Sequence, residues 1–273
     1  MIAFPNCKIN LGLSIIAKRA DGFHELETVF YPVGLQDMVE IIHSNDGSTP
    51  VEFSHTGLAI PGDASQNLCV KAYTLLKKDF PHLPSIKIHL HKYIPMGAGL
   101  GGGSSDGTAV LNLLNTQFNL GLDSNQLIDY AAQLGSDCPF FVHNKACHAT
   151  GRGELLTPIA LDLSDYRFVL IHPGIHVSTG WAFGQLHPHS KSPSIAEIIT
   201  QPIEDWKNKL INDFEAPIFK AHPQLATLKE QLYQAGAIYA SMSGSGSSLF
   251  GIFPKSTSLS ASFLNTDLRI DVI

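Results

Sequence analysis

Apolar and polar residues alternate along the first part of the chain, a pattern typical of strands with one buried face. The clearest run places Ile9, Leu11 and Leu13 at every second position. Strand-like texture returns in two further segments, 28–33 and 38–42. We therefore expect the chain to begin with β-structure.

Helical spacing of apolar residues follows this region. It predicts helices over 67–78, 104–114 and 124–134, and the last of these ends at Gly135, a residue type that often follows a helix C-terminus. Between the first two helices, residues 85–91 alternate between apolar and polar positions. This segment is expected to be a strand with one solvated face.

The second half of the chain predicts a different arrangement. We expect strands at 166–171, 237–241, 248–253 and 268–273, and helices at 224–234 and 259–264. This β-α-β-β-α-β order is ferredoxin-like, provided that 178–220 is a helical insertion after the first strand. The expected fold is α+β with two domains: an N-terminal α/β nucleotide-binding domain, 1–160, and a C-terminal ferredoxin-like domain, 161–273. The boundary is expected near 157–165.

A glycine-rich loop joins the strand at 85–91 to the helix at 104–114. It consists of Pro95, Met96, Gly97, Ala98, Gly99, Leu100, Gly101, Gly102, Gly103, Ser104 and Ser105. Its glycines allow positive φ angles and carry no Cβ, so successive N–H groups can converge on phosphate oxygens. Ser104 or Ser105 is expected to cap the helix, whose first turn favours negative charge. A flexible linker is less well supported, because the strand and the helix leave no spare residues.

The loop matches two known phosphate-binding patterns poorly. No lysine follows the glycines, which excludes a P-loop. Gly97, Gly99 and Gly102 match the dinucleotide pattern G-x-G-x-x-G, and Asp123 lies at a suitable distance for a ribose contact. However, the first strand of a dinucleotide-binding fold is continuously apolar, whereas 85–91 alternates. A nicotinamide-dependent oxidoreductase is kept as a distant alternative.

Composition excludes several classes of protein. The 273 residues are 44% hydrophobic and 15% charged, as expected for a globular chain with one large core or two smaller ones. A net charge of −6 argues against a nucleic-acid binder. We expect a cytoplasmic protein, because no apolar run is long enough for a membrane span and the N-terminus lacks signal-peptide features. The four cysteines lack ligand spacing and are expected to be reduced thiols: Cys7, Cys69, Cys138 and Cys147.

Five segments, in their order and approximate spacing, resemble the superfamily of galactokinase, homoserine kinase, mevalonate kinase and phosphomevalonate kinase (GHMP). They are NCKINLGLSI, ADGFHELET, PMGAGLGGGSS, LGSDCPFF and SGSGSS. The early D-G-F-H-E-L is similar to the branch that phosphorylates the 2-hydroxyl of diphosphocytidyl-methylerythritol in the non-mevalonate isoprenoid route. The resemblance covers nearly the whole chain. It implies an ATP-dependent kinase of two-domain GHMP fold with the active site between its domains.

The resemblance implies catalytic roles for Asp137 and Lys8. Phosphoryl transfer to an alcohol uses a carboxylate to accept the hydroxyl proton, and the family's aspartate falls at Asp137. From the residues alone, Asp137 is equally a helix cap, and Lys8 is a solvent-facing position on a strand. The family places Lys8 beside the aspartate, where its charge would keep Asp137 ionised and orient the acceptor hydroxyl.

Recognition of the cytidine end is implied for a second group of residues. His24 can both donate and accept hydrogen bonds, and Phe23 and Phe183 can stack on a base. Both phenylalanines are otherwise core candidates, and the core is favoured for Phe183 on sequence alone. The family commonly has tyrosine at position 23, so Phe23 lacks a hydroxyl. Asn10 and Thr179 match positions that contact the acceptor substrate.

A second loop, 243–246, separates two predicted strands and has the composition of a hairpin turn. The resemblance packs it near the phosphates, where its hydroxyls and amides would stabilise transferred charge. ATP and Mg²⁺ are the implied cofactors, and Ser105 is a candidate hydroxyl ligand, but the metal ligands are left unassigned. The implied partner is a cytidine diphosphate alcohol; the oligomeric state is open, a homodimer included. The alternatives are another GHMP kinase, for homoserine, mevalonate or a sugar, and a binding-only sensor, against which Lys8 and Asp137 argue.

Overall fold

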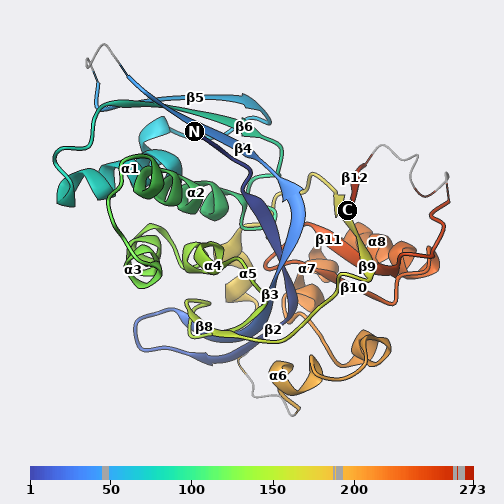
Figure 1. Ribbon diagram of the computed structural model, residues 1–273. Coiled ribbons are helices and arrows are strands. Elements are labelled where there is room, and N and C mark those ends of the chain that lie inside the picture. Colours follow the sequence, from blue (N-terminus) through green and yellow to red (C-terminus); the bar gives the residue numbers. More distant parts are fainter. Residues whose placement is uncertain (45–48, 187, 189–192, 261–262, 264–267) are drawn as a thin grey trace. The chain divides into compact units, whose positions relative to one another are not determined.

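The computed structural model describes the chain except residues 45–48, 187, 189–192, 261–262 and 264–267 (Figure 1). Spatial contacts group it into two compact units, each made of several segments. The first unit comprises 1–7, 34–96 and 101–145, and the second comprises 8–33, 97–100 and 146–273. A division near residue 160 stays a prediction.

The first unit contains a four-stranded sheet in the order β1-β4-β6-β5. Its strands are β1 (Ile2–Ala3), β4 (Met38–His43), β5 (Val51–Gly57) and β6 (Ile86–Lys92). β6 pairs antiparallel with β4 and parallel with β5. A dinucleotide-binding sheet is parallel, so the oxidoreductase alternative is wrong for this fold.

Helices complete the first unit and bury its apolar positions. They are η1 (Ala64–Gln66), α1 (Leu68–Asp79), α2 (Gly102–Gln117), α3 (Ser124–Leu134) and α4 (Cys138–His143). In Figure 1, α1 and α2 lie against one face of the sheet. Ile86, Ile88 and Leu90 point into this core, while His91 is exposed, which confirms the expected strand with one solvated face.

The second unit holds two further four-stranded sheets. One has the order β2-β3-β7-β8, formed by β2 (Asn6–Lys18), β3 (His24–Gln36), β7 (Cys147–Thr150) and β8 (Leu155–Pro158). β2 and β3 are long strands of 13 residues each, and they contribute residues to both units. β2 carries the predicted site residues Lys8 and Asn10. The segments that pack against β2 therefore determine which groups contact these two side chains.

The other sheet has the order β10-β11-β9-β12, with every neighbouring pair antiparallel. Its elements are β9 (Tyr166–His172), α8 (Pro223–Gln234), β10 (Tyr239–Met242), β11 (Leu249–Pro254) and β12 (Arg269–Val272). The four strands predicted for this region are confirmed, and so is the helix predicted over 224–234, which is α8. The helix predicted over 259–264 falls largely outside the described residues.

Short helices fill most of the expected insertion between β9 and α8. They are α5 (Thr179–Gly184), α6 (Ile195–Ile198), η2 (Ile203–Asn208) and α7 (Glu215–Ala221). Residues 211–213 instead lie beside β2: Leu13 N–H donates to Ile211 O at 3.0 Å and Asp213 N–H to Leu13 O at 2.8 Å. The described part of the insertion is therefore largely helical, with an extended segment beside β2.

Candidate active site

The glycine loop leads from β6 directly into α2. Gly101, at φ 68°, occupies the N-cap position in the left-handed region, and the helix begins at Gly102. Ser104 and Ser105 therefore lie inside the first turn, and their predicted capping role is wrong. Among the described residues, no side chain accepts a capping hydrogen bond from the first backbone N–H groups of this helix. Such groups bind anions well.

Within the second unit, residues 97–100 of this loop contact the loop at 243–246. Ser243 Oγ donates to Gly99 O at 2.8 Å, and Ser248 N–H donates to Ala98 O at 3.2 Å. A Cβ on Gly99 would lie 1.9 Å from Ser243 O, so only glycine fits this approach. The two Gly/Ser loops are thus in direct contact, as the resemblance implied.

A cavity of about 400 Å³ in the first unit opens beside Gly103 and Met96. Its other lining residues come mainly from β5, η1 and the start of α1: Phe53, His55, Ile60, Pro61, Gly62, Asp63, Ala64, Gln66, Asn67, Leu68, Leu90 and Asp106. No described atom lies within 4 Å of the place where a Cβ on Gly103 would stand. The cavity has apolar walls with a few polar groups, the usual composition of a small-molecule site.

A buried ion cluster borders this cavity. Lys92, the last residue of β6, pairs with Asp37 and, at 2.8 Å, with Asp106 Oδ2. Asp37 also accepts hydrogen bonds from the backbone N–H of Ile94 at 2.8 Å and of Tyr93. Asp106 Oδ1 is buried and has no hydrogen-bond partner among the described residues. The cluster therefore presents one unsatisfied carboxylate oxygen on a residue that lines the cavity.

The charges of this cluster shift its pKa values. Burial raises the pKa of Asp106, and Lys92 only partly opposes the rise. Burial tends to lower the pKa of Lys92, but Asp106 and Asp37 outweigh it, so this pKa is raised. We conclude that Lys92 stays charged and that Asp106 is harder to ionise in the folded chain than in the unfolded one.

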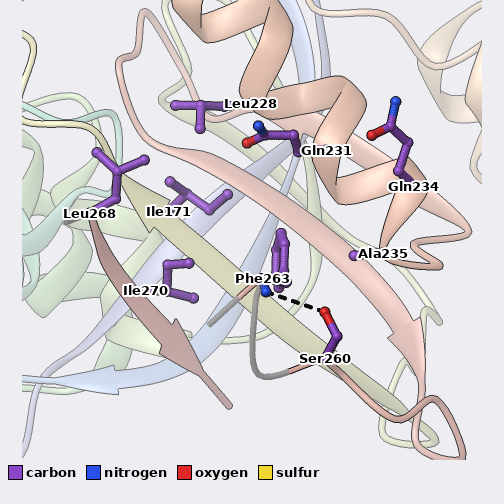
Figure 2. Close-up of a pocket in the computed structure, with 9 residues that line it drawn as sticks. All are labelled: Ile171, Leu228, Gln231, Gln234, Ala235, Ser260, Phe263, Leu268 and Ile270. Atoms are coloured by element: carbon purple, nitrogen blue, oxygen red, sulfur yellow. Dashed lines mark hydrogen bonds between the residues drawn. The ribbon is translucent and has the colours of Figure 1, made fainter. Parts of the chain in front are cut away.

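Two other cavities are lined mainly by residues that were not predicted to form the site. One, of about 260 Å³, lies between α8 and the strands β9 and β12 (Figure 2), and its lining contains no charged side chain. The other, of about 240 Å³, lies between the N-terminal segment and the helices α2 and α4. Ser105 lines this smaller cavity with Phe4 and Asn144 and is buried, so it does not line the cavity beside Gly103.

Lys8 is only 4% exposed, so the expectation of a solvent-facing position is wrong. Its Nζ donates to Asn10 Oδ1 at 2.6 Å and lies 4.5 Å from the centroid of the Phe30 ring. Asn10 Nδ2 donates to Thr28 Oγ1 at 3.1 Å, and Asn10 N–H donates to Ser243 Oγ at 3.3 Å. The structure thus brings Lys8, Asn10 and the second loop together inside the second unit.

Asp137 occupies the N-cap position of α4 in the first unit. Its carboxylate accepts no capping hydrogen bond from the described first turn, so the structure contradicts the interpretation of Asp137 as a helix cap. The following Cys138 is buried; burial, with a smaller contribution from Asp137, raises the pKa of its thiol to about 11. The Asp137 side chain is half-buried, and its catalytic role stays a prediction.

His24, at the start of β3, stacks on an aromatic ring. Its ring and that of Phe183 have centroids 4.9 Å apart and an angle of 20°. Phe183, on α5, also meets Phe214 edge to face at 4.9 Å and belongs to the margin of the core. The core role expected for Phe183 from sequence and the ring-stacking role implied by the resemblance are therefore both compatible with its position.

Phe23 is 53% exposed, so the core alternative is wrong for this residue. The guanidinium of Arg152 lies 4.5 Å from the centroid of its ring. Asp21 fixes the turn by accepting the N–H of Phe23 at 3.1 Å, and this bond is the main reason that the pKa of Asp21 is lowered. Thr179 Oγ1, at the start of α5, is hydrogen-bonded to Ser245 Oγ at 3.1 Å. An exposed aromatic ring over a cation can bind a planar ligand.

Sequence reasoning missed Lys92, Asp106 and Arg152. Lys92 follows Ile86, Ile88 and Leu90 in the same alternating phase, so its position falls on the buried face, where a lysine needs a partner. This was the available signal. Asp106 stands in the first turns of a helix next to the glycine loop, and Arg152 follows a glycine in an irregular segment. Neither position carries a periodic signal.

Among the described residues, no group of three or more His, Cys, Asp or Glu side chains is arranged to hold a metal ion. Within the same part of the chain, every helix is too short or too polar to cross a bilayer.

Comparisons with known proteins agree with this architecture. The model of the GHMP kinases N terminal domain matches residues 67–145, and that of the GHMP kinases C terminal domain matches 194–261. A protein of Bacteroides thetaiotaomicron named 4-diphosphocytidyl-2-C-methyl-D-erythritol kinase is 53% identical, covering 93% of this chain and 92% of its own length. A protein of the same name from Chlorobium phaeobacteroides is 39% identical over 90% of this chain and 86% of its own length.

Solved structures give the same result. A crystal structure of 4-(cytidine 5'-diphospho)-2C-methyl-D-erythritol kinase is 32% identical, with a TM-score of 0.80 and coverage of 92% of this chain and 90% of that one. A mevalonate kinase at 13% identity has a TM-score of 0.76, covers 100% of this chain and 98% of its own, and shares the fold alone. The chain belongs to the GHMP kinase family.

Proposed function

We propose that this chain transfers the γ-phosphoryl group of ATP to the 2-hydroxyl of 4-diphosphocytidyl-2-C-methyl-D-erythritol, a step in isoprenoid precursor synthesis. The observation that carries the proposal is the similarity, over about nine-tenths of the chain, to proteins named for this activity. The two contacting Gly/Ser loops and the exposed aromatic ring of Phe23 support it independently. Magnesium would enter with ATP and reside mainly on phosphates and water, which suits a chain whose described residues form no metal cluster.

The proposed nucleotide site uses the loop from Pro95 to Ser105. The uncapped first turn of α2 binds the phosphates, and the cavity beside Gly103 takes the nucleoside. The unsatisfied Asp106 Oδ1 supports this assignment, because a sugar hydroxyl or an amino group of a ligand can donate to it. Ser105 is not retained as a metal ligand, because its buried side chain lines a different cavity.

The proposed chemistry rests on Asp137 and Lys8. Asp137 accepts the proton of the substrate hydroxyl while the oxygen forms a bond to the γ-phosphorus, and the bond from that phosphorus to the bridging oxygen of ADP breaks. Lys8, held by Asn10, orients the hydroxyl. The amides and hydroxyls at 243–246 stabilise the transferred charge.

The cytidine end of the substrate is assigned to the aromatic residues of the second unit. Phe23, over Arg152, offers an exposed ring face, and His24 offers both donor and acceptor nitrogens beside Phe183. Thr179 lies next to Ser245, which supports its assignment to the acceptor substrate. We place the reaction in the cytoplasm, where ATP is available, and assign a small molecule as its only required partner.

An ADP-release assay with a panel of alcohols tests the proposal. The panel contains the diphosphocytidyl alcohol, mevalonate, homoserine and galactose, each with ATP and Mg²⁺. Turnover is expected with the first compound only, and phosphorus NMR is expected to show a new phosphate ester on its 2-oxygen. Equal turnover of mevalonate would instead assign the chain to another GHMP activity.

A further inference from the structure

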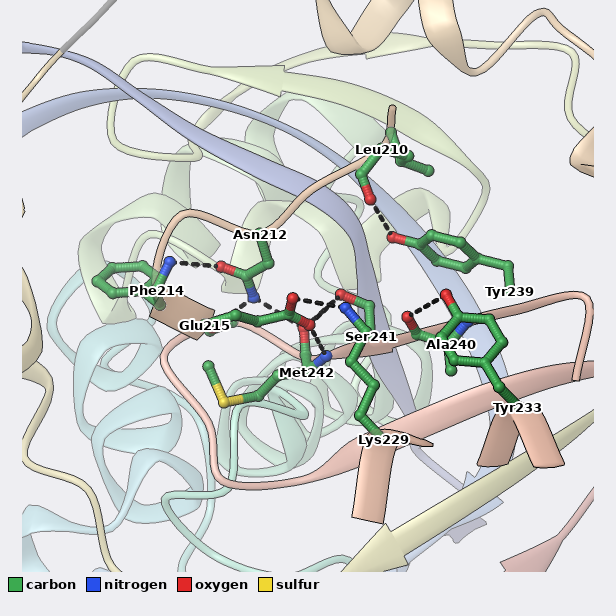
Figure 3. A network of polar contacts seen from close by, with 11 residues as sticks. Leu210, Asn212, Phe214, Glu215, Lys229, Tyr233, Tyr239, Ala240, Ser241 and Met242 are labelled. Carbon is green, nitrogen blue, oxygen red and sulfur yellow. Dashed lines mark hydrogen bonds and ion pairs between the residues drawn. The ribbon is translucent and has the colours of Figure 1, made fainter. Parts of the chain in front are cut away.

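The segment from Leu210 to Glu215 lies between strand β2 and the loop at 243–246. Its backbone pairs with Leu13 on β2, and Asp213 Oδ2 accepts the N–H of Ile15 at 2.8 Å. The side chains of Asn212 and Glu215 contact the end of β10 and the loop that follows (Figure 3). One short segment therefore contacts the strand that carries Lys8 and the second Gly/Ser loop.

Asn212 is completely buried, and three hydrogen bonds use its amide. Nδ2 donates to Met242 O and to Gly244 O, both at 2.8 Å, and Oδ1 accepts the N–H of Phe214 at 3.0 Å. Only a side-chain amide supplies two donors and an acceptor in this geometry. Gly244 O belongs to the loop itself, so Asn212 fixes the direction of its backbone.

Glu215 contacts the same end of β10 as Asn212 does. Its Oε1 accepts hydrogen bonds from Ser241 Oγ at 2.9 Å and from Met242 N–H at 2.8 Å. Its Oε2 accepts from Lys229 Nζ at 2.6 Å. A buried carboxylate is costly to desolvate, and these three donors offset that cost.

The loop does not need these two side chains to close. Ser243 N–H donates to Ser248 O at 2.9 Å, and Gly246 N–H donates to Ser243 O at 3.0 Å, so the backbone already closes the turn. The loop also contacts other candidate site residues: Ser243 Oγ bonds Gly99 O and Asn10 N–H, and Ser245 bonds Thr179. Asn212 and Glu215 thus hold a loop whose orientation relative to Asn10 and Gly99 matters.

We propose that Asn212 and Glu215 are positioning residues for phosphoryl transfer, which fix the loop at 243–246 relative to strand β2. This inference rests on the proposed role of that loop in stabilising the transferred phosphoryl group. If the turn closed but could rotate relative to β2, its amides and hydroxyls would point in many directions. Hydrogen-bond donors lower the barrier to phosphoryl transfer only when they are held in place beforehand. Loss of either residue therefore lowers kcat more than it weakens substrate binding.

The test compares Glu215→Ala, Glu215→Gln and the control Tyr73→Phe. The control removes a hydrogen bond of 3.0 Å from the Tyr73 hydroxyl to Pro84 O, in the first unit and outside the contacts of the segment and the loop. We expect Glu215→Ala to lower kcat at least tenfold with little change in KM. Glu215→Gln keeps an acceptor for Ser241 and Met242 and should restore most of kcat, although its Tm stays low because Lys229 loses its ion partner. Tyr73→Phe should lower Tm and leave kcat unchanged.

Equal kcat in Glu215→Ala and the wild type, per folded molecule, overturns the inference. Where Glu215→Ala does not fold, Asn212→Ser takes its place, since it leaves Met242 O and Gly244 O without their donor. The wild type is assayed first on the panel of alcohols. If it phosphorylates a different alcohol, the proposed function fails and the variants are tested on that alcohol, so the two failures are distinguishable.

Discussion

Asp137 and Asp123 both stand at the N-terminus of a helix, but only one of them caps its helix. Asp137 stands at the N-terminus of α4 without capping it, whereas Asp123 caps α3 with a reciprocal pair of bonds to Gln126. The same chemical change at the two positions therefore has different consequences. Asparagine caps a helix as well as aspartate does, but it cannot accept a proton.

We expect Asp137→Asn to lower kcat by about 10²–10⁴ with little change in KM or Tm. Asp123→Asn is the matched control and should leave kcat and Tm unchanged. Single-turnover rates at saturating ATP and a thermal melt measure both variants. Near-normal turnover in Asp137→Asn removes this residue from the mechanism.

Gly103 gives a second test at single-residue scale. A Cβ at this position would have no described atom within 4 Å outside its own stretch of helix, so we expect Gly103→Val to fold. Gly103 lines the cavity assigned to the nucleotide, so the valine side chain should narrow that space. ATP affinity is expected to fall at least tenfold, measured by titration with a fluorescent ATP analogue. Thr116→Val, an exposed position at the far end of the same helix, should bind normally. Unchanged affinity in Gly103→Val would show that the cavity is not the nucleotide site.

At the scale of elements, the Lys92 cluster joins the start of β4, the end of β6 and the first turns of α2. Two carboxylates and one ammonium are buried there, so a net negative charge is confined among these elements. The raised pKa of Asp106 follows chiefly from burial. The folded state therefore holds a proton on Asp106 at a pH where the unfolded chain has lost it.

This arrangement predicts a pH-dependent effect of Asp106→Asn. A carboxyl pKa that is raised by folding stabilises the fold at low pH, and this contribution is lost as pH rises toward the folded pKa. Relative to the wild type, the variant should gain stability from about pH 4, the ordinary pKa of aspartic acid, up to neutral pH and then stay level. Urea denaturation at several pH values measures this difference. Asp129→Asn, on the exposed face of α3, controls for the loss of one charge, and a pH-independent difference contradicts the account.

Elements with a regular period could be predicted, and contacts between distant segments could not. α3 and β6 were correct to within one residue because their apolar positions recur regularly. The capping role of Ser104 was wrong because Gly101 adopts a left-handed conformation that no periodicity reveals. Asn212 gave no signal, since its partners at Met242 and Gly244 are about 30 residues away.

At the scale of the whole molecule, the four cysteines report on how the two units unfold. All are buried thiols outside any disulfide, and burial raises the pKa of the Cys69, Cys138 and Cys147 thiols, the last to about 12. Cys69 and Cys138 belong to the first unit and Cys147 to the second. Their labelling by a thiol reagent therefore requires the opening of the respective unit.

We expect no labelling of the native protein within minutes, and equal labelling rates at Cys69 and Cys147 as urea is added. The reason is that each unit consists of three chain segments, so the units are joined by several crossings rather than by one linker. Mass spectrometry of the labelled peptides measures both rates. Much faster labelling at one of them shows that the units unfold independently.

The pairing of β2 with distant segments also has a consequence for synthesis on the ribosome. Asn10 leaves the ribosome early, but its partner Ser243 lies 233 residues later, and Asp213, the partner of Ile15, lies 198 residues after it. At roughly 5–20 residues per second, the strand that carries Lys8 waits on the order of ten to fifty seconds for these partners. During that interval the nascent chain exposes a strand edge, which makes it a substrate for chaperones, and any prematurely terminated product lacks the contacts that order its site.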